Sequence, residues 1–456
     1  MKLTLSDIKK LSNVEIRNEH LIKSISGVSI DSRSLQEGEL FFAIPGEKFD
    51  GHRFVDEVIE KGAAAVVINR AKLNEFENKN YPLIIVEDTI KSLGELANIF
   101  RKKFKGKIVA LSGSNGKTTT KEMIYSVLRT KYKVIKTEGN LNNYIGVPLT
   151  LFKLNNTYDF AIIEIGINHL EEMTDLCKIV EPNYGCLTNI GNAHLEFLGG
   201  IKGVAKAKGE MFRFLSQKNK MGFVNRDDKN IVKQASVLKK KFTFAFNTKA
   251  DVNGKIISIN KFLQPTIEVN YKGKSEIINL NTIGLHTAYN ALCAASVGLK
   301  FGISLRNIKS SLEKFYSYSK RMEVLEFHSG LIINDCYNAN PDSMKVAIET
   351  MGKMKGFNLK IAVLGDMLEL GRWSEKYHRK LAHHLKKNKI DLILFFGELT
   401  ENSFDEAKKL GLNAFYFKDK GYLIDKLKNS LSPNSLLLIK GSRKMKMEEI
   451  TETLVS

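Results

Sequence analysis

Long apolar stretches are missing from this chain. No run within its 456 residues approaches the roughly 20 consecutive apolar residues of a membrane-spanning helix. The amino-terminal segment carries Asp7 and Lys9 where a signal peptide would have its apolar core. We therefore expect a cytoplasmic protein that does not insert into a membrane.

Cysteine is scarce, and repeats are absent. The four cysteines show no C-x-x-C spacing, so we expect reduced, mostly buried side chains that pack as small hydrophobic residues. The chain contains no internal repeat and no low-complexity tract. Because 456 residues are too many for one hydrophobic core, the length suggests about three globular domains.

Acidic residues are too few to balance the basic ones, and the net charge is +20. Such an excess can indicate a nucleic-acid partner. Here the lysines are scattered along the chain, and no basic block is interleaved with aromatic residues. We therefore predict a solvated basic surface without a nucleic-acid partner, and this charge favours an anionic small substrate.

The segment KIVALSGSNGKTTTK, residues 107–121, has the pattern of a phosphate-binding loop. A short apolar strand leads into a Gly/Ser/Asn loop, and a helix is predicted to begin at Lys117 or Thr118. Gly113 and Gly116 allow the backbone to curl, so that N–H groups can converge on phosphate oxygens at the helix N-terminus. Lys117 offers a charge to the outer phosphates, and the hydroxyl of Thr118 can ligate Mg²⁺.

Only part of the usual P-loop spacing is present. The full pattern would have a glycine at position 111, where this chain has Leu111, so the shorter G-x-x-G-K-T-T core remains. A plain strand-turn-helix could carry the same letters. The flanking strand and helix favour nucleotide binding, with ATP as the predicted ligand.

Residues 1–100 predict a compact α/β domain. Ser32 and Arg33 follow a predicted strand, from which a hydroxyl and a guanidinium can bind a diphosphate or uracil, although D-S-R can equally cap a turn. The predicted strands are 28–31, 40–44, 65–68 and 83–86, and the predicted helices are 50–61 and 90–103.

Residues 101–315 predict a parallel sheet around the loop. The strand at 160–165 is nearly all apolar, as expected for a strand buried on both faces, and carries Glu164 at its end. The strand at 184–190 runs into His194. Either residue could lie on the surface, but their places beside a P-loop favour a Mg²⁺ role. In the following helix, Lys206 and Lys208 are two residues apart and so point to different sides.

Residues 316–456 predict a Rossmann-like parallel sheet. No G-x-G-x-x-G follows the first strand, which argues against a dinucleotide cofactor. Two polar loops, NDCYNANPDS and GDMLELG, follow strands. The predicted strands are 331–334, 360–364, 392–396, 414–417 and 436–439.

Taken in order, several strings resemble the motifs of the bacterial Mur ligase family. The segment DSR…GELFFAIPGEKFDGH is similar to the UDP-sugar domain of that family, so the resemblance spans essentially the whole chain. YNANPDSM and GDMLELG resemble the member that adds a dipeptide. The other strings are SGSNGKTTTK, GNLNNYIGVPLTLF, IEIGINH, TNIGNAHLEFLGG, KAKGEMF and LIKGSRKMKME.

The resemblance implies an ATP-dependent ligase of peptidoglycan precursor synthesis that requires Mg²⁺. ATP would phosphorylate the terminal carboxylate of UDP-N-acetylmuramoyl-tripeptide, and the amine of D-alanyl-D-alanine would attack the resulting acyl phosphate. The implied fold is α/β in three domains, and a monomer is expected. These domains are a UDP-sugar-peptide-binding domain (1–100), a central P-loop ATP-binding domain (101–315) and a C-terminal Rossmann-like domain (316–456).

The resemblance also implies residue roles. Lys208, rather than Lys206, matches a family lysine that CO₂ carbamylates, which would make it an anionic ligand for a second Mg²⁺. The implied catalytic residues are Lys117, His194 and Lys208, and the implied metal ligands are Thr118, Glu164, His194 and Lys208. The residues implied to bind substrates are Ser32, Arg33, Asn338, Asn340 and Pro341. The residues implied to bind ATP are Gly113, Ser114, Asn115, Gly116, Lys117, Thr118, Thr119, Asn290, Arg321 and Asp335.

Four positions depart from the family pattern, while the phosphate and metal residues are unchanged. Tyr144 replaces an acidic residue and Ile167 a small one. Thr287 replaces an asparagine, and Asn334 replaces the first aspartate of D-D-x-Y-N-A-N-P.

Other functions remain open on the sequence. A sibling ligase that adds a single amino acid would share the loop and metal residues, although YNANP favours the dipeptide enzyme. The DSR and GEKFDGH strings argue against a folate polyglutamate ligase. A nucleic-acid-stimulated P-loop ATPase would commonly show a basic or aromatic track and a strand ending in two acidic residues, which is not the pattern of IIEIGINH. A purely binding protein would leave Lys117 without a role.

Overall fold

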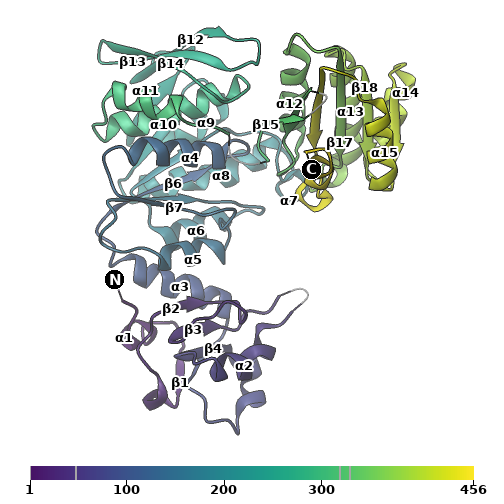
Figure 1. Cartoon of the computed structure of the whole chain (residues 1–456). Coiled ribbons are helices and arrows are strands. Elements are labelled where there is room, and N and C mark those ends of the chain that lie inside the picture. Colours follow the sequence, from purple (N-terminus) through teal and green to yellow (C-terminus); the bar gives the residue numbers. More distant parts are fainter. Residues whose placement is uncertain (1, 47–48, 318–319, 328–329, 456) are drawn as a thin grey trace. The chain divides into compact units, whose positions relative to one another are not determined.

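The computed structural model describes residues 2–46, 49–317, 320–327 and 330–455 (Figure 1). Glu47 and Lys48, which belong to the GEKFDGH string, lie outside the described residues. Within the described ranges, no helix is both long and apolar enough to span a membrane. The chain forms two compact units: unit 1 comprises Met1–Leu111, Tyr132–Ile167 and Glu172–Gly185, and unit 2 comprises Ser112–Lys131, Asn168–Glu171 and Cys186–Ser456.

The first sheet of unit 1 has the strand order β1-β5-β4-β3-β2. β2 to β5 pair in parallel, and β1 pairs antiparallel with β5. Phe41, Val66 and Ile85 pack with helix residues Val55 and Val58 in its core. The sequence predicted the four parallel strands but not β1, which is short and only half-buried throughout. The elements are α1 (Leu5–Ile8), β1 (Glu15–Arg17), β2 (Gly27–Ser29), β3 (Glu39–Phe42), α2 (Val55–Glu60), β4 (Ala65–Asn69) and β5 (Leu83–Val86).

Three further strands of unit 1 are parallel, with β8 between β6 and β7. Every residue of β8 is buried, which explains its nearly all-apolar sequence. The register pairs Glu164 with Leu111, so the carboxyl ends of β8 and β6 lie side by side. The elements are α3 (Thr89–Arg101), β6 (Lys107–Ser112), β7 (Val134–Lys136), α5 (Gly146–Phe152), β8 (Phe160–Glu164), α6 (Glu172–Val180) and β9 (Tyr184–Leu187), whose last residues belong to unit 2.

The first part of unit 2 combines helices with the strand series β10 to β14. β10, β11 and β12 pair in parallel, and β12, β13 and β14 pair antiparallel, which confirms the predicted β-rich segment at 243–282. α10 packs closely on α4, since a Cβ at Gly298 would lie 2.5 Å from Val127 Cγ1. The elements are α4 (Lys117–Leu128), α7 (Leu195–Leu198), α8 (Ile201–Gln217), β10 (Met221–Asn225), α9 (Lys229–Gln234), β11 (Lys240–Ala245), β12 (Val252–Ile259), β13 (Pro265–Tyr271), β14 (Lys274–Asn279), α10 (His286–Lys300) and α11 (Leu305–Glu313).

The four cysteines are buried and form no disulfide, as the sequence predicted. Two of them form a close pair: Cys186 of β9 and Cys293 of α10 have their sulfur atoms 3.2 Å apart. The hydrogen bond with the neighbouring thiol raises the pKa of Cys293, and burial raises it further, which favours the protonated form of this sulfur.

The last sheet of unit 2 has the strand order β15-β16-β20-β17-β18-β19. The five strands predicted here pair in parallel. The sequence did not predict β15, which pairs antiparallel with β16 at one edge of the sheet, because so few residues separate the two strands that no crossover helix fits. The elements are β15 (Glu323–Phe327), β16 (Gly330–Asn334), α12 (Pro341–Lys353), β17 (Leu359–Gly365), α13 (Ser374–Lys387), β18 (Leu392–Phe396), α14 (Glu401–Lys409), β19 (Ala414–Phe417), α15 (Lys420–Ser430), β20 (Ser435–Lys440) and α16 (Glu448–Val455).

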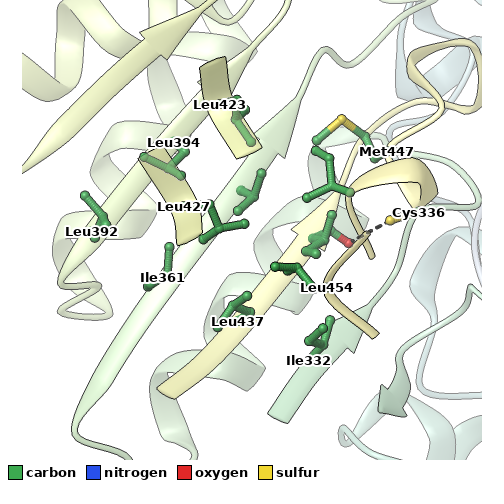
Figure 2. Packing of buried hydrophobic residues seen from close by; sticks show 13 residues of the cluster. Ile332, Cys336, Ile361, Leu392, Leu394, Leu423, Leu427, Leu437, Met447 and Leu454 are labelled. Carbon is green, nitrogen blue, oxygen red and sulfur yellow. Dashed lines mark hydrogen bonds between the residues drawn. The ribbon is translucent and has the colours of Figure 1, made fainter. Parts of the chain in front are cut away.

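Aliphatic side chains on one face of this sheet form a hydrophobic core (Figure 2). Ile361 and Leu437 from the central strands pack with Leu423 and Leu427 of α15, and Leu454 of α16 belongs to the same cluster. α15 and α16 thus cover this face, which leaves the loops after β16 and β17 available at the carboxyl ends of the strands.

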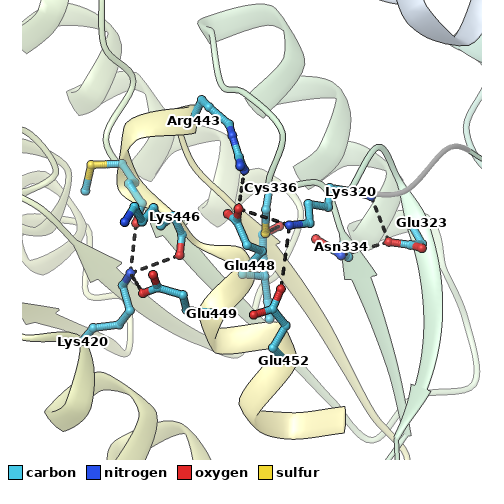
Figure 3. Close-up of polar contacts among 12 residues, drawn as sticks. Lys320, Glu323, Asn334, Cys336, Lys420, Arg443, Lys446, Glu448, Glu449 and Glu452 are labelled. Carbon is cyan, nitrogen blue, oxygen red and sulfur yellow. Dashed lines mark hydrogen bonds and ion pairs between the residues drawn. The ribbon is translucent and has the colours of Figure 1, made fainter. Parts of the chain in front are cut away.

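Asn334, one of the departures from the family pattern, belongs to a polar network at the end of β16 (Figure 3). Its Nδ2 donates to Glu323 Oε2 at 3.0 Å across the β15–β16 pair, and the backbone N–H of Lys320 donates to the same oxygen at 2.9 Å. Lys320 Nζ also pairs with Glu448 at 3.2 Å. An aspartate at 334 would set two carboxylates against each other here, so the amide suits this chain.

Val363 and Val455 offer a matched test of the C-terminal core. Val363 belongs to this hydrophobic cluster and is fully buried, whereas Val455 is 48% exposed at the end of α16. We expect Val363→Ala to lower the free energy of unfolding by about 2 kcal/mol, because the transfer and cavity terms add. Val455→Ala should change it by less than about 0.5 kcal/mol. Urea unfolding followed by circular dichroism measures both, and equal losses would contradict the described core.

Candidate active site

The loop between β6 and α4 curls around two glycines. Gly113 has φ +149° and Gly116 has φ +75°, both in the region that favours glycine. A Cβ at Gly113 would overlap Thr188 Oγ1, and one at Gly116 would lie 2.8 Å from Asn290 Oδ1. α4 begins at Lys117, as predicted. The loop therefore leads directly into a helix N-terminus that is suited to an anionic ligand.

Residues that follow β9 hold this loop in shape. The N–H of Asn115 donates to Asn189 Oδ1 at 3.0 Å, and Thr188 Oγ1 donates to the carbonyl of Asn115 at 2.6 Å. Lys117 Nζ donates to the carbonyl of Gly113 at 2.9 Å. The lysine that was predicted to bind phosphate thus lies folded over the loop it belongs to.

Lys208 of α8 is a buried lysine beside the loop. Its side chain is 1% exposed, while Lys206 is exposed on the other side of the helix, as their spacing predicted. Burial lowers the pKa of the Lys208 amine well below its ordinary value, and the positive charge of Lys117 lowers it further. Both effects favour the neutral, nucleophilic form of this amine, which α8 places close to the phosphate loop.

His194 lies immediately before α7 and pairs with a residue from the loop after β17. Its Nδ1 is 2.8 Å from Glu369 Oε2. Burial lowers the pKa of His194, the Glu369 hydrogen bond opposes this, and the positive charge of Lys117 lowers it again. The same hydrogen bond lowers the pKa of Glu369, which therefore accepts as a carboxylate. Nδ1 carries the proton, and Nε2 keeps its lone pair.

The loop after β16 reaches the phosphate loop. Asn340 Nδ2 donates to Asn115 Oδ1 at 2.7 Å, while Asn340 Oδ1 caps α12 by accepting from the N–H of Ser343. Asp342 accepts from the N–H of Asn192 at 2.6 Å and from its Nδ2 at 3.0 Å. Pro341 is the first residue of α12. The NANPDS segment therefore lies against the residues that hold the phosphate loop.

Other predicted residues of this region are held by local contacts. Asp335 Oδ2 lies 2.5 Å from Nζ of the buried Lys440, which also donates to the carbonyl of Asn338 at 2.8 Å. Arg321 places its guanidinium carbon 3.7 Å from the ring centroid of Tyr337. These contacts join the loop after β16 to Lys440 at the end of β20 and to Arg321, which precedes β15.

The remaining predicted site residues lie in unit 1. Glu164 is buried and accepts from Asn142 Nδ2 at 2.9 Å, so it is not a surface residue. Ser32 is buried, whereas Arg33 is exposed and pairs with Asp31 at 2.7 Å. Hydrogen bonds from Arg33 lower the pKa of Asp31 to about 2. In this structure the D-S-R string closes a turn, the alternative that its sequence left open.

Unit 2 thus brings the predicted Lys117, His194 and Lys208 into electrostatic contact. Among the described residues, no group of three or more His, Cys, Asp and Glu side chains could hold a metal ion by itself. Sequence reasoning missed Glu369. The GDMLELG string marked a polar loop after a strand, but no local signal indicates a partner 175 positions away.

The chain is similar to known proteins along its whole length. Three family models match: "Mur ligase family, catalytic domain" at residues 24–101, "Mur ligase middle domain" at 111–298 and "Mur ligase, glutamate ligase domain" at 320–443. The UDP-N-acetylmuramoyl-tripeptide--D-alanyl-D-alanine ligase of Bacillus subtilis is 33% identical, with 100% of this chain and 99% of the relative covered. The chain belongs to the Mur ligase family. The enzyme of the same name from Escherichia coli K12 is also 33% identical and covers 100% and 98% of the two chains.

Solved Mur ligase structures share the whole fold. MurF from Acinetobacter baumannii superimposes with a TM-score of 0.89 at 29% identity and covers 100% of this chain and 99% of that one. MurF from Thermotoga maritima, solved in complex with ADP, gives a TM-score of 0.82 at 27% identity, with coverage of 94% and 96%. The predicted α/β architecture of three Mur ligase domains is confirmed.

Gly116 and Gly273 test the shape of the phosphate loop. Both have φ +75°, but a Cβ at Gly273 would meet nothing within 4 Å, whereas at Gly116 it would press on Asn290. Either alanine variant should lose about 1 kcal/mol of stability from the left-handed backbone. Only Gly116→Ala should weaken ADP binding, by about tenfold or more, because the loop must open to make room. Titration calorimetry measures the affinity, and equal ADP affinity of the two variants would contradict the described loop.

Proposed function

We propose that this chain joins D-alanyl-D-alanine to the terminal carboxylate of UDP-N-acetylmuramoyl-tripeptide, with ATP as the energy source. The observation that carries the proposal is its 33% identity, over the full length of both chains, to the Bacillus subtilis ligase of that activity. The phosphate loop, His194 and Lys208 supply the chemistry that such a ligase needs. The product is a precursor of peptidoglycan.

The reaction has two steps. A carboxylate oxygen of the tripeptide attacks the γ-phosphorus of ATP, which forms an acyl phosphate and releases ADP. The amine of the dipeptide then attacks the acyl carbon, loses a proton and expels inorganic phosphate as the amide forms. Lys117 and the backbone of the loop would stabilise the charge on the transferred phosphoryl group, so catalysis depends mainly on positioning and electrostatics.

Each domain has a proposed share in substrate binding. Residues 1–100 would bind the UDP-sugar-peptide through Ser32 and Arg33, and residues 101–315 would bind ATP. Residues 316–456 would hold the dipeptide near Asn338, Asn340 and Pro341. Asn290, Arg321 and Asp335 would complete the nucleotide site, and we keep the prediction of a cytoplasmic monomer.

Thr118, Glu164 and His194 would hold Mg²⁺, which neutralises phosphate charge when bound. The donor chemistry fits, since His194 has its pKa lowered and keeps the Nε2 lone pair, and Thr118 is a buried hydroxyl in the first turn of α4. Lys208 fits a carbamate because its lowered pKa favours the neutral amine, which is the form that reacts with CO₂. A neutral amine adds CO₂ and loses a proton, which would replace a buried amine by an anionic oxygen ligand.

The function is tested by phosphate release from ATP and Mg²⁺ with UDP-N-acetylmuramoyl-tripeptide as acceptor. We expect turnover with D-alanyl-D-alanine and a product whose mass equals both substrates less one water. Single amino acids should give no ligation, because the NANPDS loop matches the dipeptide-adding enzymes. Turnover with a single amino acid on a shorter UDP-peptide would instead identify a sibling ligase.

Lys208 and Lys206 provide a matched pair for the carbamate. Lys208→Ala should lower kcat by about 100-fold or more, because an anionic ligand at the phosphoryl-transfer site is lost. Acetate or formate should restore part of the rate by supplying a carboxylate in its place. Lys206→Ala should retain wild-type activity, since this side chain is exposed. Near wild-type activity of Lys208→Ala would overturn the carbamate.

A further inference from the structure

The loop that follows β17 carries Glu369 against the start of α7. Besides the 2.8 Å contact between Glu369 Oε2 and His194 Nδ1, the carbonyl of Glu369 accepts from the N–H of Glu196 at 3.2 Å. Glu369 has φ +62°, which is uncommon for a residue other than glycine. Gly371, with φ +48°, packs so closely that a Cβ would lie 2.9 Å from Glu196 Cγ. Both the backbone and the side chain of Glu369 therefore hold this loop against His194 and the start of α7.

The same loop is anchored within its own sheet. His378 is fully buried; its Nε2 accepts from the N–H of Met367 at 3.1 Å, and its Nδ1 donates to the carbonyl of Ser374 at 2.9 Å. The N–H of Leu368 donates to Ser442 Oγ at 2.9 Å. Burial lowers the pKa of His378 and so favours the neutral ring that this arrangement requires. The loop that carries Glu369 is therefore held both by hydrogen bonds to His378 and Ser442 and by its contacts at the start of α7.

We propose that Glu369 is a positioning residue that orients His194 as a metal ligand. The inference rests on the proposed metal role of His194. A carboxylate that accepts from Nδ1–H fixes the neutral tautomer and the plane of the ring, so that Nε2 presents its lone pair in one direction. Because Glu369 lies on the loop after β17, His194 is oriented for metal binding only while that loop contacts the start of α7.

The size of the effect follows from exposure. Loss of an outer carboxylate partner of a ligating histidine typically weakens metal binding by about 10- to 100-fold. The Glu369 side chain is 47% exposed, so water competes for the histidine N–H, and we expect the lower end of that range. Without Glu369 the imidazole can rotate and exchange tautomers, but Nε2 is still present. Excess metal should therefore restore turnover.

The test measures Mn²⁺ binding to the full chain in the presence of ADP by electron paramagnetic resonance, beside the Mg²⁺ dependence of kcat. Glu369→Ala should weaken Mn²⁺ binding about tenfold, with kcat largely recovered at high Mg²⁺. Glu369→Gln should fall between this variant and the wild type, because an amide oxygen accepts the hydrogen bond without the charge. Glu375→Ala is the matched control, since Glu375 is an exposed glutamate of α13 that pairs with Arg379.

Variants at His194 separate this inference from the proposed function. If His194→Ala weakens Mn²⁺ binding while Glu369→Ala does not, Glu369 has no positioning role. If neither changes Mn²⁺ binding, the metal role of His194 itself is wrong. Glu369→Ala in the His194→Ala background should cause no further loss of Mn²⁺ affinity, because Glu369 acts through the histidine. A further tenfold loss in the double variant would overturn the inference.

Discussion

Removing a lysine cation from water costs free energy that only an opposite charge or a change of protonation state can offset. Lys208 is fully buried in α8, and the neighbouring charge of Lys117 is of the same sign. Both effects lower the pKa of the Lys208 amine and so favour its neutral form. Burial and the positive charge of Lys117 lower the pKa of His194 as well, so the region around the phosphate loop favours the neutral forms of both nitrogen bases. An anionic ligand is the natural complement of that arrangement.

Most of the buried apolar strands could be predicted from the sequence. β5, β18 and β19 were predicted to the residue, and α4 begins where the glycine loop required. The missed strands β1 and β15 have half-exposed residues, and β7 is short, so none of these three gives a continuous apolar run. β10 was missed as well, although four of its five residues are buried. Composition within the loops indicated which loops are candidates for the site but did not indicate which of their side chains would meet.

Contacts between distant loops illustrate that limit. Asn115 and Asn340 are joined by a hydrogen bond of 2.7 Å, although 225 positions separate them. Both asparagines were predicted as site residues, one for ATP and one for substrate, on the family resemblance alone. The departures are similarly explained only in three dimensions: Thr287 Oγ1 donates to the carbonyl of Gly284 at 2.7 Å and closes the turn before α10. Nothing in the described contacts explains Tyr144.

The thiol pair of Cys186 and Cys293 has a practical consequence. Both sulfurs are shielded completely, one on the strand before the loop-holding residues and the other on the helix that packs against α4. A thiol-modifying reagent can reach them only when α10 separates from the strand, so the rate of alkylation reports how often this part of the protein opens. The rate of alkylation of these two native thiols thus measures local opening of the part of unit 2 that carries the phosphate loop, without any engineered label.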